Sequence, residues 1–179
     1  MATAEKQPLL HDEREFQNAP ERLQRLVKFV REHWDPAFTL YRHDSTPWTS
    51  LKRPLRESRL AVITTAGFYL PDSQPPFDAH HFHGDTGVRF LPRRLSQADL
   101  AVAHEHYDHK YVKADFNVVL PLHRLEELVE EGVVGSLAEH HYSLHGYITR
   151  FTRLLSGSVP RILEQLRRDQ VDAVLLVPV

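Results

Sequence analysis

The sequence has no cysteine among its 179 residues. This absence excludes disulfide bonds, thiolate nucleophiles and cysteine-ligated zinc sites within these residues. No run approaches the roughly 20 apolar residues of a membrane-spanning helix, and residues 1–16 are polar without the apolar core of a signal peptide. We therefore expect a cytoplasmic protein that does not act at a membrane.

An excess of charge of one sign is also missing. The 22 basic and 24 acidic residues give a net charge of −2, which favours neither nucleic acid nor an anionic membrane surface as partner. Histidine, by contrast, is frequent: most of the 13 histidines lie between His80 and His145. Such clustering favours a functional site in this part of the chain.

The pattern of apolar residues predicts a polar arm over residues 1–19, followed by a single α/β domain over residues 20–179. Helices are expected at 20–36, 121–132 and 158–169, where leucine and valine recur at helical spacing and proline marks the first turns. Strands are expected at 59–65, 88–92, 100–103, 117–120 and 172–179. The final helix and strand form half of a βαβ unit, so the fold class is α/β, with a mostly parallel, Rossmann-like sheet and flanking helices.

The strand expected at 59–65 ends at Thr64, Thr65 and Gly67. Ligands of open α/β sheets bind beyond the carboxyl ends of strands, so these three residues are candidates for substrate contact. A simple tight turn at the glycine would give the same pattern.

The densest group of chemically active side chains follows the apolar run 100–103. His104, His106, Asp108 and His109 fall within six residues. In an extended chain His104, His106 and Asp108 share one face, and a turn would bring His109 to the same centre. The group is then a candidate zinc or iron site, or a set of proton-transfer residues. The alternative is a hydrogen-bonded polar cluster at a strand end.

Two further groups of histidines accompany this cluster. His140, His141 and His145 can supply a distant partner for it, or can be core-edge histidines bonded to backbone carbonyls. The loop over residues 78–85 carries three histidines and two aspartates, which suits either a second metal-binding patch or a solvated loop.

The sequence motif His104-x-His106-x-Asp108-His109 resembles the metal-binding motif of the metallo-β-lactamase hydrolases. In that family two metal ions activate a water molecule. The chain departs from the family pattern because Lys110 follows the motif where a glycine is usual, and because no histidine follows His145. A metallohydrolase is therefore the alternative function.

A longer series of motifs, in order from about residue 59 to the end, resembles the selenoprotein B family of glycine/sarcosine/betaine reductases and its D-proline reductase relatives. The matching segments are 62–67, 75–78, 104–109, 117–121, 135–138, 142–143, 146–148 and 171–178, with Leu125 and Gly132 between them. This resemblance implies reductive cleavage of an amino-acid-like substrate, by an oxidoreductase acting on X–H and Y–H to form an S–S bond with a disulfide as acceptor. A selenocysteine or cysteine would attack the substrate carbon and displace the amine.

The resemblance also implies which residues form the site. His104, His106, Asp108 and His109 would act as catalytic proton donors, or as ligands where a divalent metal is bound. Thr64, Thr65, Gly67 and Tyr142 would contact the substrate. The implied partners are other reductase subunits, a dithiol or thioredoxin-type reductant and a small amine or amino acid, with oligomerisation left open.

The redox residue of the family typically follows a strand like the one expected at 172–179. No such residue follows Val179. The sequence therefore suggests a selenoprotein whose UGA codon after Val179 was read as a stop, so that the selenocysteine is missing. Ordinary termination, an inactive member and a non-catalytic subunit are the alternatives. A truncated sheet would leave apolar surface uncovered, and the chain would then associate.

Overall fold

The computed structural model describes residues 21–34, 36–38 and 48–179, so the predicted arm over residues 1–19 lies outside the described residues. The chain divides into two compact units, residues 1–49 and 50–179. A single domain over residues 20–179 stays a prediction. The first unit contains helix α2 (Glu21–His33), where the apolar repeat predicted a helix. Val27 and Val30 are its buried residues.

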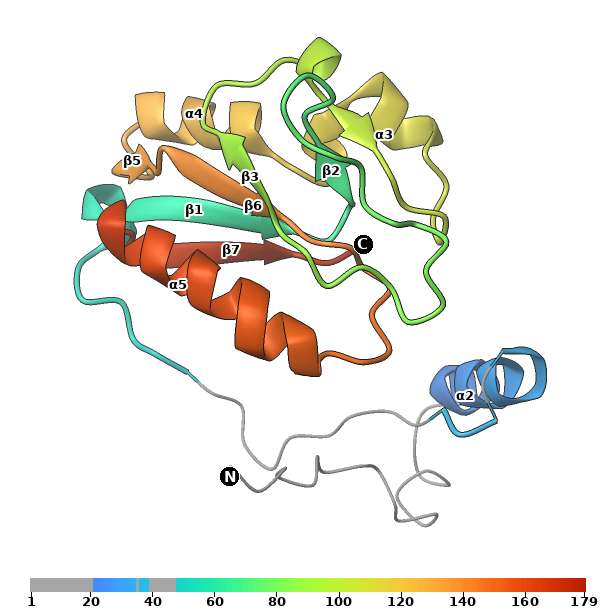
Figure 1. Ribbon diagram of the computed structural model, residues 1–179. Helices are drawn as coiled ribbons and strands as arrows, with labels where there is room; N and C mark the ends of the chain where they lie inside the picture. Colours follow the sequence, from blue (N-terminus) through green and yellow to red (C-terminus); the bar gives the residue numbers. More distant parts are fainter. Residues whose placement is uncertain (1–20, 35, 39–47) are drawn as a thin grey trace. The chain divides into compact units, whose positions relative to one another are not determined.

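The second unit is built on a five-stranded sheet (Figure 1). Its strands are β1 (Arg59–Thr64), β3 (Arg89–Pro92), β5 (Ser136–Leu137), β6 (His140–Ser143) and β7 (Ala173–Val177). β1 lies in the middle and pairs in parallel with β5, β6 and β7, while β3 pairs antiparallel with β6. A separate antiparallel pair joins β2 (Phe68–Tyr69) to β4 (Ala101–Val102).

Helices cover both faces of this sheet (Figure 1). They are α3 (Lys110–Ala114), α4 (Leu122–Glu130) and α5 (Val159–Arg168), with short turns η1 (Leu55–Glu57), η2 (Gln97–Asp99), η3 (Phe116–Val118) and the π-helical η4 (Leu154–Ser158). No helix within the described ranges has both the length and the apolar character needed to cross a membrane.

The alternation of side chains along β1 explains the two layers of helices. Leu60 and Val62 enter one core cluster with residues of α3 and α4. Ala61 enters the other cluster with Ile162 of α5. Because successive strand residues face opposite sides, a continuous apolar run such as β1 needs a cover on both faces. The predicted α/β class is confirmed.

The sheet is mixed and not purely parallel: β1 pairs in parallel with three strands, and β3 is the antiparallel strand. That strand occupies an edge and runs antiparallel to β6. An edge position tolerates Pro92, which has no N–H to donate to a ladder, and antiparallel edge strands are common on otherwise parallel sheets. The apolar run alone carries no information on strand direction.

Two other predicted strands differ in the structure. Residues 116–118 form the 3₁₀ turn η3, because the Asp115 carboxylate accepts a hydrogen bond from the Asn117 backbone N–H at 2.9 Å and starts the turn. In the run 100–103, only Ala101 and Val102 pair as a strand, and they pair with β2 outside the main sheet.

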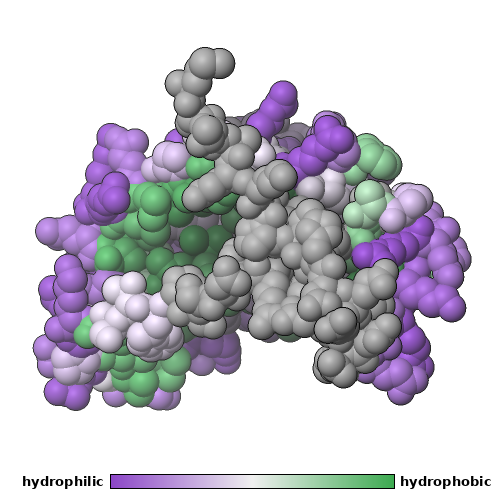
Figure 2. Space-filling model, turned by 90° about the horizontal axis from the view of Figure 1, so that it is seen from below, coloured by the Kyte–Doolittle hydropathy of each residue, from purple (hydrophilic) through white to green (hydrophobic). Residues whose placement is uncertain are grey.

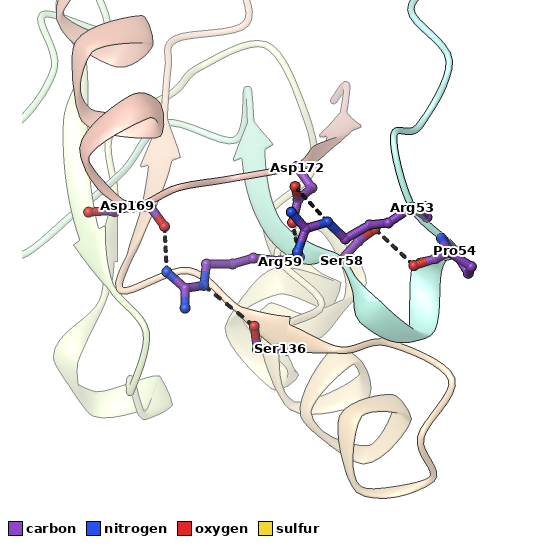
Figure 3. Close-up of polar contacts among 7 residues, drawn as sticks. All are labelled: Arg53, Pro54, Ser58, Arg59, Ser136, Asp169 and Asp172. Atoms are coloured by element: carbon purple, nitrogen blue, oxygen red, sulfur yellow. Dashed lines mark hydrogen bonds and ion pairs between the residues drawn. The ribbon is translucent and has the colours of Figure 1, made fainter.

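Polar contacts hold the amino ends of β1 and β7 together (Figure 3). The Asp172 carboxylate accepts a hydrogen bond from the Arg59 backbone N–H at 2.9 Å and pairs with the Arg53 guanidinium at 3.4 Å. Arg59 donates through Nη1 to the Asp169 carbonyl at 2.7 Å. The charged groups therefore lie at the end of the sheet opposite the carboxyl ends of the parallel strands.

β7 presents apolar side chains at the surface. Leu176 is 67% exposed, and Val174 and Leu175 are also exposed. β7 is the lowest strand of the sheet in Figure 1, and Figure 2, viewed from below, shows apolar surface (green) among polar residues (purple). Uncovered apolar surface on an outer strand favours association with another chain.

Candidate functional site

The carboxyl ends of β1, β6 and β7 are tied together by backbone and hydroxyl hydrogen bonds. Thr65 donates its N–H to the Val177 carbonyl at 3.1 Å, and Val179 donates its N–H to Thr65 Oγ1 at 2.8 Å. On the other side, Gly67 donates its N–H to the Leu144 carbonyl at 3.0 Å. This edge is where an open α/β sheet binds its ligands.

Gly67 brings the first residue of the histidine cluster to this edge. Gly67 has a φ of +72°, and a Cβ there would lie 2.7 Å from the Ala103 carbonyl oxygen and 3.0 Å from His104 Cβ. Its carbonyl accepts a hydrogen bond from the Ala103 N–H at 3.0 Å. Only a residue without a side chain allows this approach, so Gly67 and His104 lie together.

The centre of the site is a stacked pair of histidines. The rings of His104 and His145 lie 4.3 Å apart at an interplanar angle of 17°, and only 2% and 1% of these residues are exposed. Gly146 packs directly against them: a Cβ at this position would lie 2.8 Å from His104 Nε2 and about as close to the Thr65 and Val179 backbone oxygens. One ring nitrogen and two backbone oxygens therefore lie close together at this glycine.

The hydrogen bonds of these rings assign their tautomers. The His106 backbone N–H donates to His104 Nδ1 at 3.1 Å, so the proton of a neutral His104 lies on Nε2. His145 Nδ1 lies 2.9 Å from the Tyr147 carbonyl and donates to it, which leaves Nε2 of a neutral His145 as an acceptor. Both Nε2 atoms are buried and have no hydrogen-bond partner among the residues that the structure describes. The site therefore offers one unused donor and one unused acceptor.

Burial disfavours the charged form of His104. It lowers the pKa of His104 to about 4, with smaller contributions from His145, His106 and His109. Burial also lowers the pKa of His106 and raises that of Tyr107 to about 12. At neutral pH His104 is thus a neutral hydrogen-bond donor, and the Tyr107 hydroxyl remains protonated and donates to the Ala66 carbonyl at 2.9 Å.

Of the other predicted cluster residues, His106 stays next to the pair, with its ring 5.7 Å from the His104 ring, while Asp108 and His109 have other neighbours. His106 is exposed and lies over the Tyr147 ring at 4.2 Å. Asp108 accepts a hydrogen bond from the Lys110 N–H at 2.9 Å, where α3 begins, and the His109 ring packs against Tyr107. The part of the chain that the structure describes contains no group of three or more histidine or carboxylate residues placed to hold a metal ion.

The predicted substrate residues are likewise divided. Thr64 and Thr65 lie at the end of β1 beside Gly67; Thr64 is buried and accepts a hydrogen bond from the Ala66 N–H at 3.2 Å. Tyr142 is buried in the core cluster covered by α5, where its ring packs edge-on against Phe90. It is placed as a core residue and not beside the histidine pair.

Sequence reasoning did not identify Gly146 and Tyr147 as parts of the site. Gly146 admits the His104 ring, and Tyr147 receives the His145 hydrogen bond and packs on His106. Their signal was available in the segment 146–148, which carries part of the family resemblance. Nothing in their residue types alone indicates these contacts.

Protonation of two buried histidines should make the fold sensitive to acid. Burial lowers the pKa of both His104 and His141 to about 4, from an ordinary value of 6.5. Between these values the unfolded chain binds more protons than the folded chain, so stability falls as the pH falls from 6.5 toward 4. We expect urea denaturation to give a free energy of unfolding lower at pH 5 than at pH 7.5 by about 1 kcal/mol or more for each histidine.

The matched variant for this measurement is His104→Asn combined with His141→Asn. An asparagine oxygen replaces the Nδ1 acceptor that receives the His106 N–H or the Val62 N–H, but it does not titrate. The double variant should lose less stability between pH 7.5 and pH 5 than the parent chain. Equal losses of stability in the two proteins would contradict the assignment of the acid sensitivity to His104 and His141.

The fold and the site together define an α/β protein with a stacked pair of buried histidines at the carboxyl ends of its parallel strands. The chain belongs to the glycine/sarcosine/betaine reductase selenoprotein B (GRDB) family, whose family model matches residues 10–179. This match confirms the family that the sequence motifs indicated. No solved structure matches the chain significantly.

Curated relatives are subunits of reductases. The chain is 29% identical over 129 residues to the D-proline reductase subunit gamma of Acetoanaerobium sticklandii, covering 72% of this chain and 52% of the relative. It is 28% identical over 173 residues to the glycine reductase complex component B subunit gamma of Symbiobacterium thermophilum, covering 92% and 38%. It is 27% identical to the sarcosine reductase complex component B subunit beta of Peptoclostridium acidaminophilum, covering 83% and 33%. The chain thus spans between a third and about half of each of these relatives.

Proposed function

We propose that this chain is a subunit of a reductase complex that cleaves a small amino-acid-like substrate, and that the reacting end of the substrate lies at the His104–His145 pair. The observation that carries the proposal is the pair of buried, unpartnered Nε2 atoms at the carboxyl ends of the strands. Buried polar atoms are rarely left without a partner, so an unused donor beside an unused acceptor favours a ligand there. The alternation of parallel strands and helices supports a Rossmann-like fold as the scaffold.

The reaction requires groups that these residues do not contain. A thiolate or selenolate attacks the substrate carbon, the C–N bond breaks, and the amine leaves with the electron pair and takes up a proton. A dithiol then releases the reduced carbon product and is oxidised to a disulfide, which balances the two electrons. Because cysteine is absent from the 179 residues, the nucleophile and the dithiol must come from outside them.

The two histidines have complementary tasks in this proposal. Neutral His104 donates from Nε2 to an oxygen or to the departing nitrogen, and His145 accepts an N–H of the substrate through Nε2. A neutral imidazole with a lowered pKa is a hydrogen-bond donor and a poor proton source at pH 7. His104 therefore holds and polarises the substrate, and the proton for the amine comes from another group.

The test is reconstitution with the other subunits of a D-proline reductase or of a glycine reductase complex, the assemblies named for the relatives of this chain. The complex is supplied with dithiothreitol and, in turn, with glycine, sarcosine, betaine or D-proline, and consumption of each is measured by mass spectrometry. We expect dithiol-dependent cleavage of one of them only when this chain is present. Unchanged turnover without the chain would contradict the proposal, and two tightly bound metal ions per chain would instead support the metallohydrolase alternative.

A further inference from the structure

The edges of the main sheet differ in how they are protected against another strand. β3 ends the sheet on one side and carries Arg89, which is charged, and Pro92, which has no backbone N–H. β5 is only two residues long. β7 is five residues long, and within the described part of the chain it pairs with β1 alone. Short length, charges and proline are the usual means by which proteins block an edge strand, and β7 has none of them.

The side chains of β7 are apolar on both faces of the strand. Its sequence is Ala-Val-Leu-Leu-Val, and Val174, Leu175 and Leu176 are all exposed. Ala61 and Val62, which are register partners of the first two in β1, are completely buried. Continuous apolar runs are typical of parallel strands that are covered on both faces. β7 therefore has the composition of an interior strand at an edge position.

The segment that follows β7 reaches the histidine pair. Val179 donates its N–H to Thr65 Oγ1 at 2.8 Å. A Cβ on Gly146 would lie 2.8 Å from His104 Nε2 and 3.1 Å from the Val179 backbone oxygen, so both atoms flank the same glycine. Neighbouring strands of a sheet lie about 5 Å apart, and parallel strands end at the same edge. A strand added in parallel to β7 would therefore end beside this site.

We propose that the free edge of β7 binds, in parallel, an apolar strand of the polypeptide that carries the thiolate or selenolate which these residues lack. The proposal rests on the proposed function, because it names the partner of that site: the nucleophile would follow the added strand and face the His104–His145 pair. The relatives are reductase subunits, and the chain spans between a third and about half of each, so such assemblies contain further sequence that can supply a strand. Backbone hydrogen bonds would give affinity, and apolar side chains would pack against Val174 and Leu176.

A second copy of this chain fits the edge less well. Two copies of β7 related by a two-fold axis would pair antiparallel. Each carboxyl end would then lie beside the amino end of the other strand, where Asp172 is paired with Arg53, and away from the other histidine pair. The chain also contains no cysteine, so a second copy brings no thiolate. The edge therefore suits a different polypeptide.

The experiment measures binding of this chain to the other subunits of a D-proline reductase and of a glycine reductase complex by analytical ultracentrifugation. We expect a complex whose dissociation constant rises about tenfold or more in the double variant Val174→Lys, Leu176→Lys, because two charges would be buried against the added strand. Val118→Lys, at an exposed apolar residue of η3, is the matched control. Urea midpoints show whether the variants fold. Leu176→Lys alone, at the most exposed position of β7, should weaken binding in the same direction if the double variant is unstable.

The direction of the added strand is tested by cross-linking, because the chain has no cysteine of its own. Val174→Cys and Val179→Cys each introduce one thiol at an exposed position, and each complex is treated with a short bismaleimide. A parallel strand predicts that Val179→Cys is linked to the redox-active cysteine or selenocysteine of the partner, identified by mass spectrometry, and that Val174→Cys is not. Preferential linkage from Val174→Cys would overturn the parallel arrangement.

The remaining outcomes separate this interface from the proposed reaction. Binding that is weakened in the β7 variants, without dithiol-dependent cleavage in the complex, supports the interface and overturns the reaction. Cleavage at an unchanged rate by the double lysine variant supports the reaction and overturns the interface. Absence of a complex with both sets of subunits, equal binding by the parent and the double variant, or a dimer of this chain that the double variant abolishes also overturns the interface.

Discussion

Replacing Gly84 by alanine is expected to destabilise the sheet unit by about 3 kcal/mol or more. Gly84 has a φ of +77°, which an L-residue adopts only at a cost of about 1 kcal/mol. The added Cβ would also overlap the Tyr147 carbonyl oxygen and lie 2.7 Å from its carbon. These are backbone atoms that cannot rotate away, so the two loops must separate and the hydrogen bond from His145 to Tyr147 must shift.

Alanine variants of two other glycines separate the cost of the positive φ from the cost of the Cβ contact. Gly132 has a φ of +73° but open space around its Cβ position, so Gly132→Ala should cost only the conformational term of about 1 kcal/mol. Gly157 has neither a positive φ nor a neighbour within 4 Å, so Gly157→Ala should be neutral or slightly stabilising. Urea denaturation of the three variants should rank them in this order. A Gly84→Ala midpoint equal to that of Gly157→Ala would show that the contact does not form.

The elements that the sequence predicted well are those with long apolar patterns. The run at residues 59–65 became the central strand β1, and the repeat after Pro121 became α4. The pairing of β1 with β7 joins Leu60 to Ala173, and no local pattern encodes a partner so far away in the chain. Short apolar runs are ambiguous because they fit several local structures. The run at 117–120 was predicted to be a strand, but residues 116–118 form a 3₁₀ turn.

The site was only partly predictable because it depends on which histidine each strand end presents. His104 was expected, but the sequence offered His140, His141 and His145 equally as its partner. In the structure His140 pairs with Asp169 at 2.8 Å and His141 accepts the Val62 N–H, which leaves His145. The expectation that Asp108 shares a centre with His104 assumed an extended chain. The turn into α3 instead places Asp108 on the Lys110 N–H.

The largest expected effect on activity comes from removing the unpartnered Nε2 atoms. His104→Asn keeps an acceptor for the His106 N–H, and His145→Asn keeps a donor for the Tyr147 carbonyl, but neither variant has an atom at the Nε2 position. Under the proposed function, each should lower kcat/KM of the reconstituted complex by about 100-fold. His104→Gln and His145→Gln place an amide group near that position and should retain part of the activity.

A purely structural role for the His104–His145 pair predicts a different result for the asparagine variants. Both rings are buried, so the asparagine variants leave a cavity and should lower the urea midpoint at pH 7.5 whichever role the pair has. If the histidines only filled the core, the activity per folded molecule would stay constant. His80→Asn, at an exposed position of the 78–86 loop, should change neither quantity. A loss of activity per folded molecule therefore distinguishes a substrate-holding pair from a packed one.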